Sequence, residues 1–557
     1  MQNKKRLKFG IICDTHCLAD WQIETINQLI LSEKADLSLI ILAESDQINM
    51  NKSSFLIKMR GKLFSKNLFF SIWQKFLKRE SHQNLNKIHN FSSDEIIFNC
   101  TTKKKGKYRD YFSDENLKEI EKYQLDFILR FGLNILIGKI LTIPKYGVWS
   151  FHHGDERKYR GRPACFWEMF NNEHKIGGIL QRLTEKLDGG IILKRWFIQN
   201  NKLSWYENLK NLRQYGTGLP KQVCFDILNE NSDYIFDTPS KTNAEIKYLP
   251  TNSEMLFFFY VITKNRLFSF FKKFCVENWR IGIIEKDIND YIFNLNNDKI
   301  HWIESKDQNK FFADPFPLMI NNKLNILFET FNHKSGIGHI SKFIFDEENN
   351  VFGSKEVLKD GDHYSYPFIY TENDNVYLIP EQMSKNNVSI YQINPKSGDI
   401  INKNNILNNI KLSDPTIFYH NSKFWLFGTV EGIKLMAWYA DTIDGPWFEH
   451  LNNPIKIDVS SSRNGGSVFY DNNNLIRLAQ DCSKEYGSRI AVNQISELTK
   501  KTFYEKTIKY IEPQKNWKFN EGLHTISHTK KYVIIDAKRT VFHLQIMIRK
   551  IVRKLGI

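Results

Sequence analysis

An internal repeat in the second half of the chain restricts its fold more than any other feature of the sequence. From about residue 310 onward, a short apolar strand, a polar turn and a second apolar strand recur five times. Matched positions in the five copies lie 52, 48, 52 and 57 residues apart, at Pro315, Pro367, Pro415, Ser467 and His524. A unit of this kind that repeats about every 50 residues is typical of a β-propeller blade. The repeat therefore predicts an all-β five-bladed propeller over residues 280–539, closed by a strand near Trp279–Glu285 that pairs with the last copy.

Acidic side chains stand near the inner strands of these repeats and are candidates for binding a substrate. They are Asp314, Glu329, Glu381, Asp414 and Asp481, together with Asp536. Two carboxylates at a suitable separation would permit glycoside hydrolysis. Asp-Pro can equally recur because every blade needs the same turn. Sugar binding, sugar hydrolysis and a purely structural ring therefore all stay open for this half of the chain.

The first half has the pattern of a different fold class. An apolar run at Leu7–Cys13 predicts a buried strand, Trp21–Ser32 has helical periodicity, and Asp36–Ala43 predicts a second strand. Further strands are expected at 95–100, 126–131 and 147–152. The turn after the first strand is not glycine-rich, so the pattern does not support a dinucleotide site. The sequence predicts a Rossmann-like α/β domain, whose ligands would bind at the carboxyl ends of its strands.

Two side chains that could take part in catalysis follow strands of this predicted sheet. The strand Gly147–Phe151 runs directly into His152, and a second strand precedes the turn Leu187-Asp188-Gly189-Gly190. Arg160-Gly161 closes a charged turn between them. His152 and Asp188 are therefore expected at the ends of two buried strands.

This stretch resembles the catalytic core of the folate-dependent formyltransferases. In that family a strand carries Asn-x-His, a loop of the form Leu-Pro-x-x-Arg-Gly follows, and an Asp arrives in a Leu/Ile-Asp-x-Gly turn. The corresponding segments here are Ser150-Phe151-His152, Lys158-Tyr159-Arg160-Gly161 and Leu187-Asp188-Gly189-Gly190, so Ser150 replaces the Asn. The resemblance extends over about the first 200 residues and includes Asp126–Gly132.

The resemblance implies a role for each matched residue. It implies that His152, Asp188 and Ser150 are catalytic and that Phe131, Gly132, Arg160 and Gly161 contact the cofactor, 10-formyltetrahydrofolate. Formyl transfer to an amine passes through a tetrahedral oxyanion, which needs preorganised donors in a dry cleft. A His can donate to that oxyanion or relay a proton, and a carboxylate can orient the His or accept the proton. Ser150 can still donate one hydrogen bond, although its side chain is shorter than that of Asn.

The repeat domain resembles two kinds of known propeller. One is the five-bladed propeller of glycoside hydrolases with Asp-Pro motifs, and the other is the propeller-like domain of the plant glucosamine inositolphosphorylceramide transferases. Both resemblances imply a carbohydrate ligand, for which His363, Tyr364, Tyr366, Tyr486 and Arg489 would suit a pocket. The expected function is thus formyl transfer to an amine, in particular an amino sugar used in surface polysaccharide biosynthesis. The alternatives are a glycan-processing enzyme with its chemistry in the propeller, a glycan-binding protein without catalysis, and an enzyme like methionyl-tRNA formyltransferase.

Two segments outside the predicted cores carry apolar and basic residues. The expected division is an α/β domain at 1–230, a linker and helix at 231–279, the propeller at 280–539 and a basic amphipathic helix at 540–557. The helix at 253–279 would either pack between domains or contact a membrane. The terminal helix would either lie on an anionic membrane surface or pack back on the protein.

Charge and cysteine content limit the surroundings in which the chain works. The net charge is +16 with a pI near 9.2, which favours anionic partners or reflects the composition of the genome. Seven Cys residues without framework spacing favour a reducing compartment. Cys13-x-x-His16-Cys17 lacks a second cluster, so no metal is expected. We expect a cytoplasmic enzyme, peripheral at most to the inner face of the membrane, with a small-molecule or glycan acceptor and no nucleic acid partner.

Overall fold

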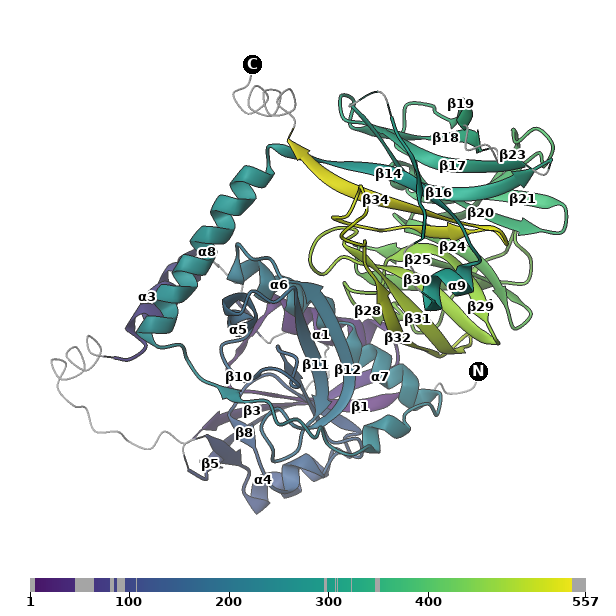
Figure 1. Cartoon of the computed structure of the whole chain (residues 1–557). Coiled ribbons are helices and arrows are strands. Elements are labelled where there is room, and N and C mark those ends of the chain that lie inside the picture. The colour runs from purple at the N-terminus through teal and green to yellow at the C-terminus, as the bar shows by residue number, and fades with distance from the viewer. Residues whose placement is uncertain are drawn as a thin grey trace. The chain divides into compact units, whose positions relative to one another are not determined.

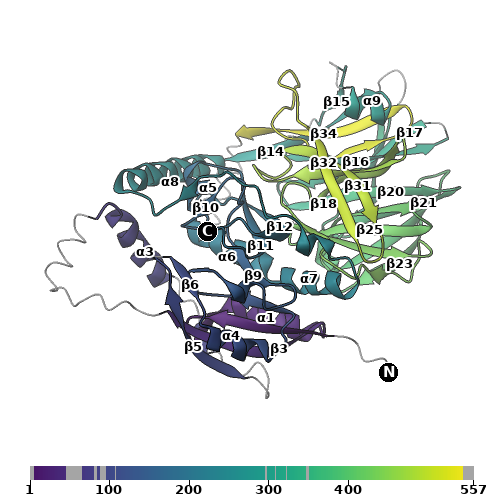
Figure 2. The same ribbon diagram turned by 90° about the horizontal axis from the view of Figure 1, so that it is seen from below.

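The computed structural model describes residues 6–45, 65–80, 85–87, 96–106, 108–294, 298–305, 307, 309–321, 323–345 and 351–542. The chain forms two compact units, Met1–Arg266 and Leu267–Ile557, shown in two views in Figures 1 and 2. The boundary lies inside helix α8 (Asn252–Lys272), within the segment that the sequence assigns to a linker and helix. Each unit has its own sheets and its own buried cores.

The first unit is built on a sheet with a parallel centre. Its described strands are, in spatial order, β12 (Ile191–Gln199), β11 (Lys175–Arg182), β9 (Val148–His152), β7 (Phe127–Arg130), β1 (Leu7–Cys13), β3 (Ala35–Ser45), β5 (Ile97–Lys104), β6 (Arg109–Tyr111) and β8 (Ile135–Leu136). The strands from β9 to β5 are parallel, whereas β11 is antiparallel to both β9 and β12. The predicted α/β domain is therefore confirmed. Because β9 and β7 are parallel, His152 and Phe131 lie toward the same edge of the sheet.

Helices cover both faces of this sheet. The described helices are α1 (Asp20–Leu31), α3 (Leu68–Glu80), α4 (Asp114–Glu121), η1 (Lys139–Leu141), α5 (Phe166–Phe170), α6 (Trp205–Gly216), α7 (Leu219–Leu228) and η2 (Asp233–Phe236). On one face, Leu117 and Ile120 of α4 pack with Ile128 and Val148 of the sheet. Alternation along the strands places Ser150 and His152 on the same face as Val148. On the other side, Trp196 donates through Nε1 to the carbonyl oxygen of Leu212 in α6, at 2.8 Å.

The segment predicted as a linker, 231–252, belongs to the first unit. Its strand β13 (Ile246–Lys247) pairs in parallel with β10 (Arg160–Gly161), and a second short pair joins β2 (Cys17–Ala19) to β4 (Leu85–Lys87). A two-residue strand has no period that a sequence pattern could show. The last predicted linker residues thus hold the Arg160-Gly161 turn in place.

The second unit consists of five four-stranded antiparallel blades, which confirms the predicted propeller (Figure 1). A single parallel bridge between Gly466 and Ile526 joins two of these blades into one eight-stranded sheet. The blades are β16 (Lys310–Ile320), β17 (Lys323–Asn332), β18 (Ile337–Phe345), β19 (Val351–Leu358); β20 (Ser365–Glu372), β21 (Asn375–Glu381), β22 (Asn387–Ile393), β23 (Ile400–Asn408); β24 (Ser413–His420), β25 (Lys423–Val430), β26 (Lys434–Ala440), β27 (Phe448–Glu449); β29 (Asn464–Asp471), β30 (Asn474–Asp481), β31 (Arg489–Leu498), β32 (Phe503–Ile511); and β33 (Ile526–His528), β34 (Tyr532–Phe542), β14 (Cys275–Glu285), β15 (His301–Ile303). Strand β28 (Lys456–Ile457) also pairs with β26, and α9 (Ile288–Phe293) and η3 (Met383–Lys385) are short helices.

The first strand of the unit completes the last blade. Strand β14 pairs with β34 from Cys275, opposite Phe542, to Glu285, opposite Tyr532. The inner strands β16, β20, β24, β29 and β33 contact one another in ring order, and β33 contacts β16. The predicted helix at 253–279 therefore ends earlier than expected, because its last residues belong to this closing strand.

The Asp-Pro motif and its counterparts mark a β-bulge within four of the five inner strands and not a turn between strands. Asp314, Tyr366 and Asp414 have positive φ values of 51°, 44° and 50°, and the pairing register of β16, β20 and β24 shifts at these residues. Gly466, with φ of 140°, lies where β29 shifts in the same way. A bulge bends the strand and turns a side chain toward a new direction. The repeat thus redirects one residue in each of these four strands.

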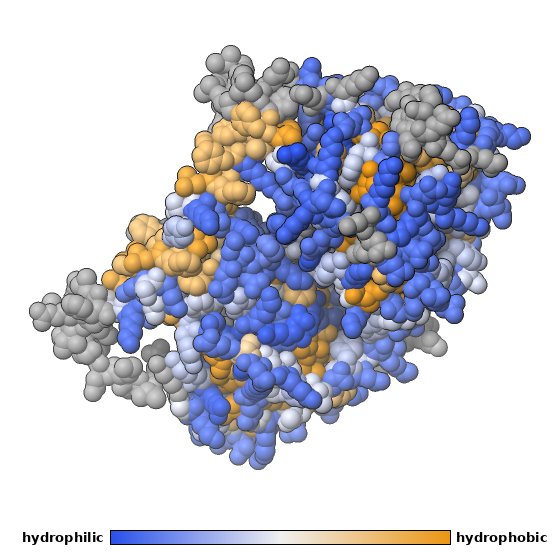
Figure 3. All heavy atoms as spheres, viewed as in Figure 1, coloured by the Kyte–Doolittle hydropathy of each residue, from blue (hydrophilic) through white to orange (hydrophobic). Residues whose placement is uncertain are grey.

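Helix α8 presents much of its apolar surface to solvent. Only Met255 and Phe258 are buried, whereas Leu256, Phe257, Phe259, Tyr260, Leu267, Phe268, Phe270 and Phe271 are exposed (Figure 3). No helix of the described residues combines the length and apolarity needed to cross a bilayer. At the other end, β34 runs to Phe542, and the remainder of the predicted basic helix, 543–557, lies outside the described residues.

Candidate functional site

His152 and Asp188 meet at the carboxyl end of β9. Asp188 lies in the loop between β11 and β12, not at the end of a strand as expected, and has a positive φ of 49°. Its Oδ1 is 3.2 Å from Nδ1 of His152, and both side chains are nearly buried. Its Oδ2 accepts a hydrogen bond from the backbone N–H of Gly161, at 2.8 Å. The three segments that the resemblance singled out are therefore in contact.

Arg160 and Gly161 hold the Asp188 turn by contacts within the protein. The Arg160 guanidinium donates to the carbonyl oxygen of Leu187 through Nε at 3.1 Å and Nη2 at 2.6 Å. Gly161 has φ of 87°, and a Cβ there would lie 2.2 Å from the carbonyl oxygen of Lys247 in β13. Only glycine fits this close approach. Both residues thus position Asp188, and their predicted contact with a cofactor stays a prediction.

Ser150 and Gly132 bind the guanidinium of Arg130, the last residue of β7. Arg130 donates to Ser150 Oγ through Nη1 at 3.2 Å and to the carbonyl oxygen of Gly132 through Nε at 2.8 Å. Phe131 packs edge-on against Trp21, with ring centroids 5.8 Å apart. The Ser150 hydroxyl in turn donates to the carbonyl oxygen of Phe151, at 3.5 Å. The chain therefore retains one hydroxyl, already engaged within the protein, where the formyltransferase motif has Asn.

The electrostatics of the pair favour a protonated His152 and an ionised Asp188. Burial lowers the pKa of His152, but the Asp188 carboxylate outweighs burial and raises that pKa overall. Burial acts in the opposite sense on Asp188, and the His152 charge lowers the pKa of Asp188 overall. Nε2 of His152 also lies 3.1 Å from the carbonyl oxygen of Tyr159. Both ring nitrogens thus face acceptors, which is the environment of an imidazolium.

Glu168 is a further ionisable residue of this site, and sequence reasoning missed it. It lies in α5 and lines a small pocket together with His152, Tyr159, Gly161 and Cys165. Its side chain is buried, and among the described residues its Oε1 has no hydrogen-bond partner. Burial raises the pKa of Glu168 to about 7. The only signal in the sequence is one acid inside the apolar run Phe166-Trp-Glu-Met-Phe170.

Four of the five acids predicted in the propeller converge near its axis. Asp314, Glu329, Glu381 and Asp414 lie close enough for their charges to affect one another, together with Asp536. Burial, followed by the charges of these neighbours, raises the pKa of Glu329 well above its usual range. Asp481 is engaged elsewhere, because its carboxylate accepts from Arg489 Nε and from the backbone N–H of Ser483, at 2.8 and 2.9 Å. A role for any of the five in binding a substrate stays a prediction.

Several of these carboxylates bind the backbone of a neighbouring blade. Asp536 accepts from the N–H of Asp314 at 2.8 Å, and Glu381 accepts from the N–H of Asp414 at 3.0 Å. Asp314 in turn accepts from the N–H of Tyr366 at 3.3 Å. Each contact satisfies the backbone of a bulge, so these acids connect one blade to the next. Glu329 differs, since its Oε1 lies 3.8 Å from Nε2 of His363, beyond hydrogen-bond distance.

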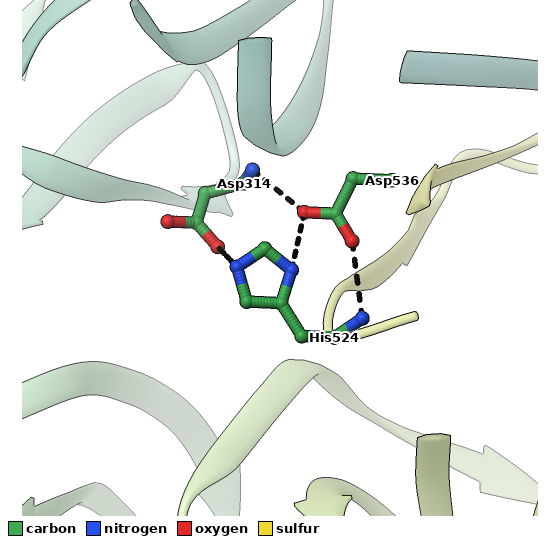
Figure 4. A group of neighbouring side chains, drawn as sticks. All are labelled: Asp314, His524 and Asp536. Carbon is green, nitrogen blue, oxygen red and sulfur yellow. Dashed lines mark hydrogen bonds and ion pairs between the residues drawn. The ribbon is translucent and has the colours of Figure 1, made fainter. Parts of the chain in front are cut away.

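His524, which the sequence offered only as a matched position of the repeat, lies between two of these acids (Figure 4). Its Nδ1 is 2.7 Å from Asp536 Oδ2, and its Nε2 is 3.4 Å from Asp314 Oδ1. Burial lowers the pKa of His524, but the two carboxylates raise it overall. The three groups are near enough to hold a metal ion. Both ring nitrogens face carboxylates, but Nδ1 makes no hydrogen bond of standard geometry within the described residues.

The two units are similar to different known proteins. Residues 301–531 match the family described as glucosamine inositolphosphorylceramide transferase 1, N-terminal. The chain is 29% identical over 212 residues to glucosamine inositolphosphorylceramide transferase 1 of Arabidopsis thaliana. The matched stretch covers 36% of this chain and 27% of that protein. The chain thus spans about a quarter of the length of this plant relative.

The N-terminal region is distantly similar to formyltransferases. The chain is 32% identical over 120 residues to the bifunctional polymyxin resistance protein ArnA of Wigglesworthia glossinidia brevipalpis, covering 20% of this chain and 18% of that protein. It is 31% identical over 98 residues to methionyl-tRNA formyltransferase of Prochlorococcus marinus, covering 17% of this chain and 28% of that protein. The predicted resemblance of the first unit is therefore confirmed at the level of a distant relationship.

Solved structures of glycoside hydrolases resemble the chain weakly. An exo-β-1,3-galactanase from Phanerochaete chrysosporium has a TM-score of 0.29 at 16% identity, covering 35% of this chain and 51% of that chain. RS223-β-xylosidase has a TM-score of 0.33 at 11% identity, covering 42% of this chain and 84% of that chain. TM-scores this low carry no argument about the fold or the function of the second unit.

Proposed function

We propose that this chain transfers a formyl group from 10-formyltetrahydrofolate to an amine. The observation that carries the proposal is the buried His152–Asp188 pair, in contact with Gly161, within a region distantly similar to formyltransferases. An imidazolium that an ionised carboxylate orients can stabilise a developing oxyanion and can give a proton to a leaving group. Both functions are needed when a formyl group moves between two nitrogens.

The chemistry of the pocket residues fits a formyl donor of this kind. When bound, the donor supplies the formyl carbon and a nitrogen that leaves with a proton. His152 holds a proton on a ring whose two nitrogens face acceptors, and Glu168 Oε1 is without a partner beside it. Phe131 offers an aromatic surface at the same edge of the sheet, and Arg130 fixes Ser150 behind it. One proton donor, one potential acceptor and a hydroxyl are thus gathered in one place.

We propose an amino sugar as the acceptor. The support comes from the second unit, whose relatives bear the name of glucosamine, an amino sugar. A propeller that binds a glycan could deliver an amine-bearing sugar to a transferase on the same chain. Methionyl-tRNA is the competing acceptor, because one relative of the first unit is a methionyl-tRNA formyltransferase.

The direct test is to incubate the purified chain with 10-formyltetrahydrofolate that is isotopically labelled in the formyl group. The acceptors to offer are free and nucleotide-linked amino sugars and, in a separate arm, methionyl-tRNA. Mass spectrometry should find one labelled formyl group on an amino sugar, and His152→Ala and Asp188→Asn should abolish it. Glu115→Gln, an exposed carboxylate at the start of α4, serves as the matched control. Labelling of methionyl-tRNA alone would replace the acceptor, and no labelled product from any amine would overturn the proposal.

A second candidate function is glycan processing within the propeller. Glu329 favours it, because this buried acid has a raised pKa and its Oε1 lies 3.8 Å from Nε2 of His363. A carboxylic acid that stays protonated at neutral pH can act as a general acid on a glycosidic oxygen. Release of reducing sugar from glycans by the wild type and not by Glu329→Gln would support this function, whereas Asp188→Asn should leave it unchanged.

A further inference from the structure

Glu168 is set apart from the other carboxylates around it because it has no cationic partner and one of its oxygens makes no hydrogen bond within the described residues. Asp155 accepts from Arg157 and lies near Arg195, and Glu156 binds Arg195 through both oxygens. Glu173 binds Lys158 and accepts from the hydroxyl of Tyr159. Glu168 has no cation of this kind, and Oε1 is without a hydrogen bond among the described residues. A buried, unsatisfied carboxyl is costly to the fold, so its presence in a pocket indicates a use.

The contacts of His152 leave the reaction without a proton acceptor, and Glu168 can fill that role. Nδ1 faces Asp188 and Nε2 faces the carbonyl oxygen of Tyr159, and two such acceptors favour the protonated ring. A protonated imidazole cannot take a proton from an attacking amine. Asp188 cannot do so readily either, because it is tied to His152 and to the N–H of Gly161. Among the side chains that line the pocket with His152, the carboxylate with a free oxygen is Glu168.

We propose that Glu168 accepts the proton of the acceptor amine, and that His152 supplies the proton to the leaving nitrogen. This inference rests on the proposed formyl transfer. In the step, the acceptor nitrogen forms a bond to the formyl carbon and gives one proton to Glu168. His152 gives one proton to the donor nitrogen as the bond between that nitrogen and the formyl carbon breaks, and the electron pair of that bond stays on the nitrogen. Glu168 ends neutral, His152 ends with one proton fewer, and exchange with solvent restores both.

The ionisation of Glu168 suits this role near neutral pH. Burial is the main reason that the pKa of Glu168 rises to about 7. A hydrogen bond to its own backbone and the charge of His152 lower this pKa, and the carboxylates of Glu173 and Asp155 raise it further. The hydroxyl of Tyr159 and the thiol of Cys165 are the other titratable groups that interact with it. A base works best when its pKa is close to the working pH. Transfer should therefore increase as pH rises through about 7, where Glu168 becomes ionised.

The test compares Glu168→Gln with Glu115→Gln, the exposed carboxylate at the start of α4. With the labelled donor and an accepted amine, Glu168→Gln should lower kcat by on the order of 100- to 10,000-fold with little change in KM, and the rise near pH 7 should disappear. Glu115→Gln should keep both the rate and the rise. A second readout uses the unliganded protein: infrared spectra with isotope-labelled glutamate should show a carboxylic acid band that is lost near pH 7 and is absent from Glu168→Gln.

Each outcome decides between the parts of the argument. If the wild type transfers formyl groups and Glu168→Gln does so at the same rate and with the same pH profile, Glu168 is not the base although the proposed function stands. A loss of rate that leaves the pH profile unchanged would likewise overturn the role of base. If the wild type transfers to no amine, the proposed function fails and this inference fails with it. A folded Glu168→Gln protein, checked by its melting curve, excludes misfolding as the reason for a loss.

Discussion

Both units contain a buried His paired with Asp, yet the surroundings of the two pairs differ. His152 faces one carboxylate and the carbonyl oxygen of Tyr159, while His524 lies between Asp536 and Asp314. Asp188 accepts one backbone amide, from Gly161, whereas Asp536 accepts three, from Asp314, His524 and Thr525. A buried His–Asp pair is therefore no evidence of catalysis by itself. The pair in the first unit has an unpartnered carboxyl beside it, and the pair in the second unit holds strands together.

The largest effect should come from Asp188→Asn. The substitution keeps the size of the side chain but removes the charge that raises the pKa of His152, so the imidazole should become neutral. Without its proton His152 cannot serve as acid, and kcat for formyl transfer should fall by on the order of 100- to 10,000-fold. A kcat within about threefold of the wild type would show that the His152–Asp188 pair, like the His524–Asp536 pair, has no catalytic role.

The corresponding change in the propeller should affect stability and not transfer. Asp536→Ala leaves three backbone N–H groups and the imidazole of His524 without their acceptor, inside a buried region. Removing one side of a buried charged network costs about 3 to 5 kcal/mol. Unfolding in urea, followed by the fluorescence of the tryptophans, should show the second unit unfolding at lower denaturant. Formyl transfer at low temperature should be retained, and an unchanged unfolding curve would contradict the structural role of Asp536.

Glu168 should also affect stability, in a way that depends on pH. The pKa of Glu168 is about 7 in the folded chain, against an ordinary value of 4.5, so folding favours its neutral form. The stability that it contributes is fully present below pH 4.5 and is lost as pH rises through about 7, a loss of about 3 kcal/mol. Glu168→Gln, which is neutral throughout, should match the wild type at pH 4 and exceed its stability at pH 8.5. Parallel stability curves for the two proteins would show that the pKa of Glu168 is the same in the folded and the unfolded chain.

The sequence predicts most of the fold because both units depend on periodic features. The blade repeat and the apolar strands at Leu7–Cys13 and 147–152 give periodic patterns that can be recognised in the sequence alone. Single contacts between distant segments give no such pattern. The pairing of β13 with β10 joins residues more than 80 positions apart, and His524 meets Asp314 across more than 200.

The candidate site was predictable to the extent that it follows the formyltransferase motif. His152 and Asp188 were placed together by that resemblance, and the structure brings them within 3.2 Å. Glu168 was not found, because an acid inside a short apolar helix looks like any exposed charge until its burial is known. Acids in the repeat looked alike in sequence, but Asp481 binds Arg489 while Asp314 and Glu381 bind bulged backbone. Which carboxylate is left without a partner is decided only by the packed structure.

Ser150 should give the smallest effect and the finest test of how far the first site differs from the formyltransferase motif. Its Oγ accepts from Arg130, which also donates to the carbonyl oxygens of Gly132 and Leu133 and so keeps its place without Ser150. Ser150→Ala should therefore cost about 1 kcal/mol in kcat/KM, the value of one ordinary hydrogen bond. Loss of an oxyanion donor would instead cost on the order of 100- to 1000-fold. The size of the loss, set against Ser150→Asn as the variant with the family residue, decides whether the hydroxyl stabilises the oxyanion or only packs against Arg130.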